Sequence, residues 1–318
     1  MSIAFILAGF LLLMFGGDTL VTGAVNVAKR LNMPAIVIGI VLVGFGTSVP
    51  ELLTSVQANM QGYPGIAVGN VIGSNIANIL LVAGAGAILV PIVADKGDLQ
   101  RDGLVLGLSS LMFLAAAYSG LISYGLGLLF VVALVVYVAY LVISTRRTAR
   151  EEKKALQDAE NATVEDPPKS LGMAIVYTLG GIALTVLGAD LLVRGATDIA
   201  TNYGISDTII GLTIVAIGTS LPELATAIMA GIRGQSDISV GNIIGSNIYN
   251  ILAILGITAL IKPLVIDPSV LNFDIWVMLA SSAALLILPF IIGTIGRKTG
   301  IVFLIAYAVY LYILYLQI

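Results

Sequence analysis

Ten apolar segments, each close to the length of a membrane-spanning helix, constrain this 318-residue chain more than any other feature. A helix needs about 20 apolar residues to cross the hydrocarbon core of a bilayer. Hydrophobic residues make up 58% of the chain and charged residues only 10%, whereas soluble domains carry about 25% charged residues. The sequence therefore predicts an all-α polytopic membrane protein, with spans at 3–27, 34–60, 64–92, 103–119, 121–144, 170–194, 206–232, 236–263, 272–293 and 300–318.

The distribution of Lys and Arg predicts how these spans are oriented. With the N-terminus outside the cell, thirteen of the 15 basic residues fall on the cytoplasmic side, and only Arg194 and Lys262 fall outside. We therefore expect a multi-pass cell (plasma) membrane protein with both termini outside and a cytoplasmic loop at 145–170. This loop mixes both signs of charge and ends in Pro167-Pro168, which predicts a charged helix followed by a solvated linker.

The composition also excludes several kinds of function. The chain contains no Cys and no His, which removes disulfides, thiolate chemistry, haem ligation and most zinc or copper sites. Its net charge is −3 and it has no basic stripe, so nucleic acid is not expected as a partner. We expect no cofactor and no enzymatic activity, since no nucleophile constellation is present. Any bound ion must be held by oxygen ligands.

An internal repeat organises the chain. The sequence matches itself at an offset of 172 residues, without a gap, over residues 18–84. The halves 1–144 and 171–318 each hold five spans, and an odd number inserts the second half upside down. The sequence therefore predicts two inverted five-helix repeats, the design of secondary transporters whose substrate lies near the membrane midplane.

The motif Gly-Thr-Ser-x-Pro-Glu occurs in mid-membrane in both repeats. Pro50 and Pro222 lack the N–H that would bond the carbonyl four residues earlier, so we expect helices 2 and 7 to be broken and to free carbonyls at 44–46 and 216–218. Bare carbonyls in a membrane need a partner, and a cation can serve. The hydroxyls and carboxylates beside each break share one helix face and suit Na⁺ or Ca²⁺; they belong to Thr47, Ser48, Glu51, Thr219, Ser220 and Glu223.

A second polar face recurs in spans 3 and 8, within the motif Gly-Asn-x-x-Gly-Ser-Asn. Its members stand four residues apart on one side of each helix and are Asn70, Ser74, Asn78, Asn242, Ser246 and Asn250. Such residues often serve as polar contacts between membrane helices. We interpret Asn70 and Asn242 in that way and take the other four as candidate ligands.

Asp18 and Asp190 are the remaining acids inside the spans. We expect structural roles for them, such as bonding to loop backbone or, for Asp190, pairing with Arg194 one turn later. A place on the ion path is the alternative.

At these motifs the chain resembles the Ca²⁺/cation antiporter superfamily, specifically its prokaryotic sodium/calcium exchanger branch. The stretches 39–84 and 211–256 look like the α-repeats of that family, and the ten-span layout fits the whole chain. The resemblance implies four cation sites between the broken helices, with spans 1 and 6 sliding across the other eight. It implies a central calcium site formed by Glu51, Glu223, Thr47 and Thr219, flanking sodium sites formed by Ser48, Ser74 and the Gly44 carbonyl and by Ser220, Ser246 and the Ala216 carbonyl, and a middle completed by Asn78 and Asn250.

One position departs from the family pattern. Some members carry an aspartate where this chain has Asn250, so this cluster has two carboxylates rather than three, and potassium co-transport is less expected. The leading prediction is an electrogenic antiporter that exchanges Na⁺ for Ca²⁺ by alternating access as a monomer. A Ca²⁺/H⁺ antiporter that uses the same glutamates remains an alternative, since buried carboxyls can carry protons. A passive cation channel is a further alternative function.

Overall fold

The computed structural model describes residues 2–92, 96–157, 170–203 and 216–316. Helices dominate these residues. In the first half they are α1 (Ser2–Leu31), α2 (Ala35–Ile38), the π-helix η1 (Gly39–Gly44), α3 (Phe45–Thr47), α4 (Val49–Met60), α5 (Pro64–Ala77), the π-helix η2 (Asn78–Ala83), α6 (Gly84–Leu89), α7 (Lys96–Ser119) and α8 (Tyr124–Gln157).

The second half continues the pattern. Its helices are α9 (Leu171–Asn202), α11 (Ala216–Thr219), α12 (Leu221–Ile232), α13 (Ser236–Tyr249), the π-helix η4 (Asn250–Leu255), α14 (Gly256–Ile261), the 3₁₀-helix η5 (Pro268–Leu271), α15 (Asp274–Ile292) and α16 (Arg297–Leu316). Two short strands, β1 (Leu121–Ile122) and β2 (Leu264–Val265), pair antiparallel and connect the two halves.

The apolar helices identify a multi-pass membrane protein. Eight helices of the described chain are long and apolar enough to cross a bilayer, and the bent pair Ala35–Thr47 and Val49–Met60 makes a ninth if it is one span. The shorter apolar helix α12 falls within the predicted seventh span, whose residues 206–215 lie outside the described part of the chain. Large apolar side chains such as Val136 and Ile291 are exposed on the outer helices, as expected for surfaces that face lipid.

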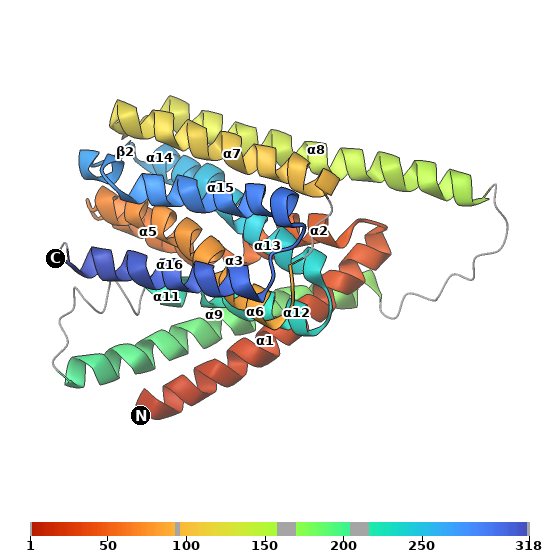
Figure 1. Cartoon of the computed structure of the whole chain (residues 1–318), viewed down its shortest axis with the longest axis horizontal. Helices are drawn as coiled ribbons and strands as arrows, with labels where there is room; N and C mark the ends of the chain where they lie inside the picture. The colour runs from red at the N-terminus through yellow and green to blue at the C-terminus, as the bar shows by residue number, and fades with distance from the viewer. Residues whose placement is uncertain (1, 93–95, 158–169, 204–215, 317–318) are drawn as a thin grey trace.

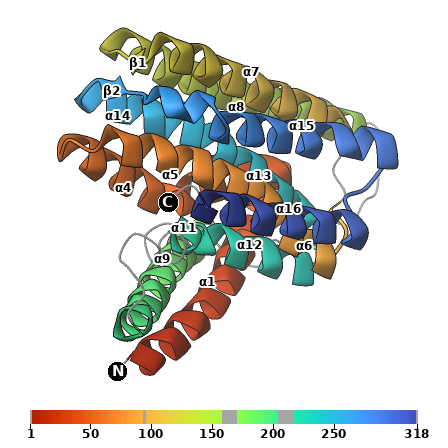
Figure 2. The same ribbon diagram turned by 60° about the vertical axis from the view of Figure 1, so that its left-hand side comes forward.

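The internal repeat of the sequence is also visible in the helix boundaries. Helices α4, α5, η2 and α6 begin and end at positions 172 residues before the bounds of α12, α13, η4 and α14. The helices of Pro64–Leu89 and Ser236–Ile261 bury 78% and 89% of their most apolar windows, against 44% or less for the other spanning helices. These two are therefore the central helices, and α7, α8, α15 and α16 lie outside them (Figures 1 and 2).

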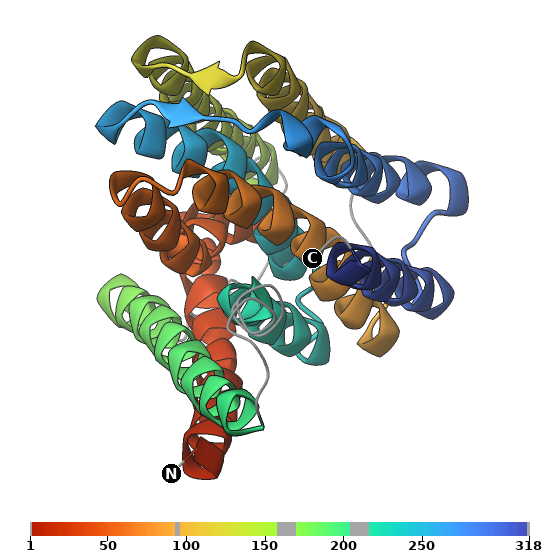
Figure 3. The same cartoon turned by 90° about the vertical axis from the view of Figure 1, so that its left-hand side faces the viewer.

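Helices α1 and α9 form a pair at one side of the bundle (Figure 3). They run antiparallel, and glycines spaced seven residues apart bring their backbones together. A Cβ atom added at Gly9 would lie 2.6 Å from the carbonyl oxygen of Gly188, and one added at Gly16 would lie 2.7 Å from the amide nitrogen of Thr185. Small residues permit this kind of close approach between membrane helices.

Helices α7 and α8 extend beyond their predicted spans. Helix α8 continues into the charged loop as far as Gln157, as the helical part of the loop prediction allowed. Helix α7, however, begins at Lys96 rather than at residue 103. Asp102 lies in this additional stretch and is fully buried, where Arg101 Nε donates to it at 2.7 Å and the Tyr137 hydroxyl at 3.0 Å. A paired carboxylate is tolerated where an isolated one is not.

Candidate cation site

The helix of the first Gly-Thr-Ser-x-Pro-Glu motif is interrupted at Ser48. Helix α3 ends at Thr47 and α4 begins at Val49, and the two segments are bent by 43°. Ser48 has φ −85° and ψ 5°, outside the helical range. Pro50 follows within the first turn of α4, where the backbone N–H that proline lacks would have no partner inside the helix.

The second motif has the same local structure. Helix α11 ends at Thr219, Ser220 has φ −89° and ψ 3°, and α12 begins at Leu221 with Pro222 in its first turn. The two motifs therefore place a serine at the break and a glutamate one turn into the following helix in both repeats.

The prediction that the breaks leave free carbonyls was wrong for Gly44. Its carbonyl oxygen accepts from the Ser48 N–H at 3.2 Å and lies 3.4 Å from Ser246 Oγ. Pro50 lacks the N–H that would bond the carbonyl of Gly46. Gly44 lies two residues earlier, and the N–H that bonds its carbonyl belongs to Ser48, which is present. A carbonyl oxygen has two lone pairs, so Gly44 remains a candidate ligand.

The two glutamates of the motifs are both buried. Glu51 is 1% exposed and Glu223 is 0% exposed, and their carboxylates are close enough to interact electrostatically. Ser48 and Ser246 each direct a hydroxyl toward Glu223 Oε1 at 3.4 Å. No Lys or Arg of the described residues forms an ion pair with either glutamate.

Unpartnered oxygen and nitrogen atoms are concentrated at this site. Twelve buried side-chain polar atoms have no hydrogen-bond partner among the described residues, and eight of them belong to predicted ligands. They are both carboxylate oxygens of Glu51, Glu223 Oε2, Ser220 Oγ and both amide atoms of Asn78 and Asn250. Buried polar atoms are seldom left without a partner, so this cluster has the donor set and the unsatisfied oxygens that a hard cation requires.

The Thr47 hydroxyl has contacts in both repeats. It is fully buried, and its Oγ1 lies 3.1 Å from the Val43 carbonyl oxygen, 3.1 Å from Asn242 Oδ1 and 3.4 Å from Ser246 Oγ. Its counterpart Thr219 is partly exposed at the end of α11. The contacts of Thr47 with Asn242 and Ser246, together with the contact of Ser246 with Gly44, join the first repeat to the second.

Helices α5 and α13 supply the remaining candidates. Ser74, Ser246, Asn78 and Asn250 are all buried, with 3% exposure or less. The π-helices η2 and η4, which the sequence analysis missed, begin at Asn78 and Asn250. Segments of π-helix are uncommon and often occur at functional sites. The only signal that could have located them is the repeated Asn-Ile-Leu that opens both segments.

Three predictions about the other polar residues can be compared with the structure. Asn70 does connect helices, because its Nδ2 donates to the Glu51 carbonyl at 3.1 Å and to Ser55 Oγ at 2.9 Å. Arg194 pairs with Asp190 at 2.9 Å, as predicted. Asp18 also has a structural contact, although with a side chain rather than with loop backbone: its carboxylate accepts from Arg233 Nε at 2.6 Å and so connects α1 to the end of α12.

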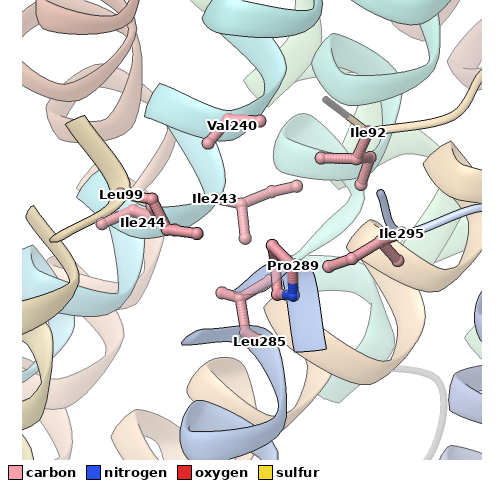
Figure 4. A pocket seen from close by; sticks show the side chains of 8 residues that line it. All are labelled: Ile92, Leu99, Val240, Ile243, Ile244, Leu285, Pro289 and Ile295. Carbon is pink, nitrogen blue, oxygen red and sulfur yellow. The ribbon is translucent and has the colours of Figure 1, made fainter. Parts of the chain in front are cut away.

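An apolar cavity elsewhere in the bundle is not a second ion site. The side chains that line it point into a common space (Figure 4) and carry no oxygen ligand: Ile92, Leu99, Val240, Ile243, Ile244, Leu285, Pro289 and Ile295. Across the described residues, no group of three or more acidic, His or Cys side chains could hold a metal ion.

The fold and this buried oxygen cluster define a polytopic membrane protein with a candidate cation site at the centre of its helices. The family described as sodium/calcium exchanger protein matches residues 1–145 and 173–316. The chain belongs to the sodium/calcium exchanger family.

Relatives cover nearly the whole chain. Sodium/calcium exchanger MaX1 of Methanosarcina acetivorans is 33% identical over 98% of this chain and 97% of its own length. Inner membrane protein YrbG of Escherichia coli is 36% identical over 89% of this chain and 86% of its own length. A structure of the sodium-calcium exchanger NCX_Mj soaked with zero Na⁺ and Ca²⁺ is 34% identical, with a TM-score of 0.82 and coverage of 98% of both chains.

Proposed function

We propose that this protein is a secondary antiporter that exchanges Na⁺ for Ca²⁺ across the plasma membrane by alternating access. The observation that supports this most directly is the set of eight unpartnered buried atoms on Glu51, Glu223, Ser220, Asn78 and Asn250. An occupying cation would satisfy the oxygens among them. Family membership and the likeness to NCX_Mj support the choice of Na⁺ and Ca²⁺ as the ions.

The charges of the site favour an electrogenic cycle. Two ionised glutamates neutralise one Ca²⁺, whereas three Na⁺ ions leave the same cluster with a charge of +1. The neutral hydroxyls of Ser48, Ser74 and Ser246 suit a monovalent metal ion, and a site that carries only protons has no need of them. The proposed ligands are the ones that the sequence predicts. They include Thr47, Thr219, Gly44 and Ala216 in addition to the two glutamates.

The proposed architecture is two inverted five-helix repeats in ten spans, with both termini outside and the loop 145–170 in the cytoplasm. The repeated helix boundaries support it. The tight α1–α9 pair is the unit proposed to move across the remaining helices, because its backbones contact each other through glycine. A single chain contains the whole candidate site, so a monomer suffices.

Calcium uptake into proteoliposomes tests the proposal. Vesicles loaded with Na⁺ and diluted into Na⁺-free buffer should accumulate ⁴⁵Ca²⁺, while Na⁺-free vesicles with an equivalent proton gradient should not. Equal uptake under both gradients would support the Ca²⁺/H⁺ alternative. Unsaturable flux with no dependence on a counter-ion would indicate a channel.

A further inference from the structure

We propose that Asn242 positions Thr47 for calcium, by holding the Thr47 hydroxyl proton so that the oxygen presents a lone pair to the ion. Asn242 is not among the predicted ligands, and its motif suggests only a contact between helices. The inference rests on the proposed function, because it assigns a role within the same calcium site.

The Asn242 amide lies between the two repeats. It is fully buried on α13, and its Oδ1 lies 3.1 Å from Thr47 Oγ1, which is on α3. On its other side, Nδ2 donates to the backbone carbonyl of Glu223 on α12 at 3.5 Å. The opposite orientation of the amide would place Oδ1 against that carbonyl oxygen, two acceptors facing each other. One side chain thus contacts two elements that carry proposed calcium ligands.

The direction of the Thr47 proton decides whether Thr47 can bind a cation. A hydroxyl has one proton and two lone pairs, and Ca²⁺ requires a lone pair. Thr47 Oγ1 has two acceptors at 3.1 Å, the Val43 carbonyl of its own helix and Asn242 Oδ1 of the opposite repeat. The bond to Asn242 fixes the side chain across the interface between repeats, where the Glu223 carboxylate also lies.

A sequence difference between the repeats explains why this role falls to Asn242. Its counterpart Asn70 donates to Ser55 Oγ at 2.9 Å and to the Glu51 carbonyl at 3.1 Å, both in its own repeat. The position equivalent to Ser55 in the second repeat is Ala227, which offers no hydroxyl. Within its own repeat Asn242 Oδ1 has only a longer hydroxyl contact among the described residues, to Ser246 Oγ at 3.5 Å, and its shorter contact is the one to Thr47 at 3.1 Å in the other repeat.

A double-mutant cycle in the full-length protein tests this role. Asn242→Leu keeps a similar volume and removes the amide, and Thr47→Val removes the hydroxyl. We expect Asn242→Leu to raise the KM for Ca²⁺ roughly three- to tenfold, the loss of one hydrogen bond, with the half-saturating Na⁺ concentration changed less than about twofold. In the Thr47→Val background the same substitution should add less than about twofold, because coupled residues are not additive.

Thr47→Ser keeps the hydroxyl, so the full effect of Asn242→Leu should persist in that background. Ser110→Ala is the matched control, since Ser110 Oγ only bonds the Leu106 carbonyl of its own helix at 2.8 Å, and it should transport as the wild type does. Additive effects of Asn242→Leu and Thr47→Val would overturn the proposal. Asn242→Ala repeats the cycle with a smaller side chain, and failure of both variants to fold would assign Asn242 to stability instead.

Failure of the proposed function gives a different result. In that case the wild-type protein shows no Na⁺-driven Ca²⁺ uptake, and the cycle has no KM to compare. Wild-type exchange together with an additive cycle refutes the role of Asn242 alone.

Discussion

Replacing Glu51 with Gln is the most direct test of the cation site. The substitution keeps the shape of the side chain and removes one of the two charges proposed to balance Ca²⁺. Glu51 is 1% exposed and neither carboxylate oxygen has a partner among the described residues. No nearby group can therefore compensate for the lost charge.

Coulomb's law gives the size of the effect. Two unit charges about 4 Å apart interact with about 4 kcal/mol at an effective dielectric constant of about 20. The lost attraction of one carboxylate for Ca²⁺ then corresponds to roughly a thousandfold weaker binding. At a calcium concentration one hundred times the wild-type Kd, the ion stabilises the wild-type protein by about 2.7 kcal/mol, whereas the variant should gain under about 0.1 kcal/mol.

Thermal unfolding in detergent measures this difference. The wild-type Tm should rise with Ca²⁺, and the Tm of Glu51→Gln should not. Without ions the variant should be at least as stable as the wild type, because an unpaired buried charge has been removed. Asp190→Asn is the matched control, since it makes the same acid-to-amide change in an exposed pair with Arg194, and it should keep the full calcium response. A Glu51→Gln protein whose Tm responds to Ca²⁺ within tenfold of the wild-type concentration would refute the assignment of the site.

Three further predictions follow from the proposed cycle and from the contacts of the outer acids. An imposed potential of 100 mV should change the equilibrium Ca²⁺ accumulation by about 2.3 kcal/mol for one transported charge, roughly fiftyfold, and accumulation independent of voltage would contradict the 3:1 ratio. Asn250→Asp adds a third carboxylate beside two others, which must be balanced by a proton or another cation, so exchange should depend more steeply on pH; an unchanged pH profile would remove Asn250 from the cluster. Asp18→Asn breaks the ion pair between α1 and Arg233, a partly exposed contact of the kind that contributes about 0–1 kcal/mol, and should change kcat by up to about fivefold while the KM for Ca²⁺ stays constant. A changed KM would instead place Asp18 on the ion path.

Much of this fold could be predicted because the bilayer makes the length of apolar segments informative. The helical, membrane-spanning nature of the chain was predicted correctly, and so was the family. Helix α7 begins before its predicted span, in a stretch where hydropathy counts Asp102 as a charged residue. The structure instead pairs that acid with Arg101 and Tyr137, and these partners come from tertiary packing.

At the site, too, the sequence predicted local features of a helix but not the contacts that come from tertiary packing. The proline and glycine of each motif indicated where the helix would be interrupted, because both residues act on their own helix. Neither the π-helices nor the contact between Thr47 and Asn242 follows from such local rules. That contact joins residues 195 positions apart in the sequence.

The bonds between protein groups at the site are long, and this suits transport. Ser48 and Ser246 approach Glu223 Oε1 at 3.4 Å, well beyond the usual 2.5–3.0 Å for hydroxyl donors. Contacts this weak are replaced by an ion at little cost. A Lys or Arg in the same position would neutralise the carboxylate permanently and exclude the cation, and no such ion pair with Glu51 or Glu223 occurs among the described residues. The cluster combines two unpaired carboxylates with weak hydroxyl donors, which leaves the ions themselves as the charges that balance it.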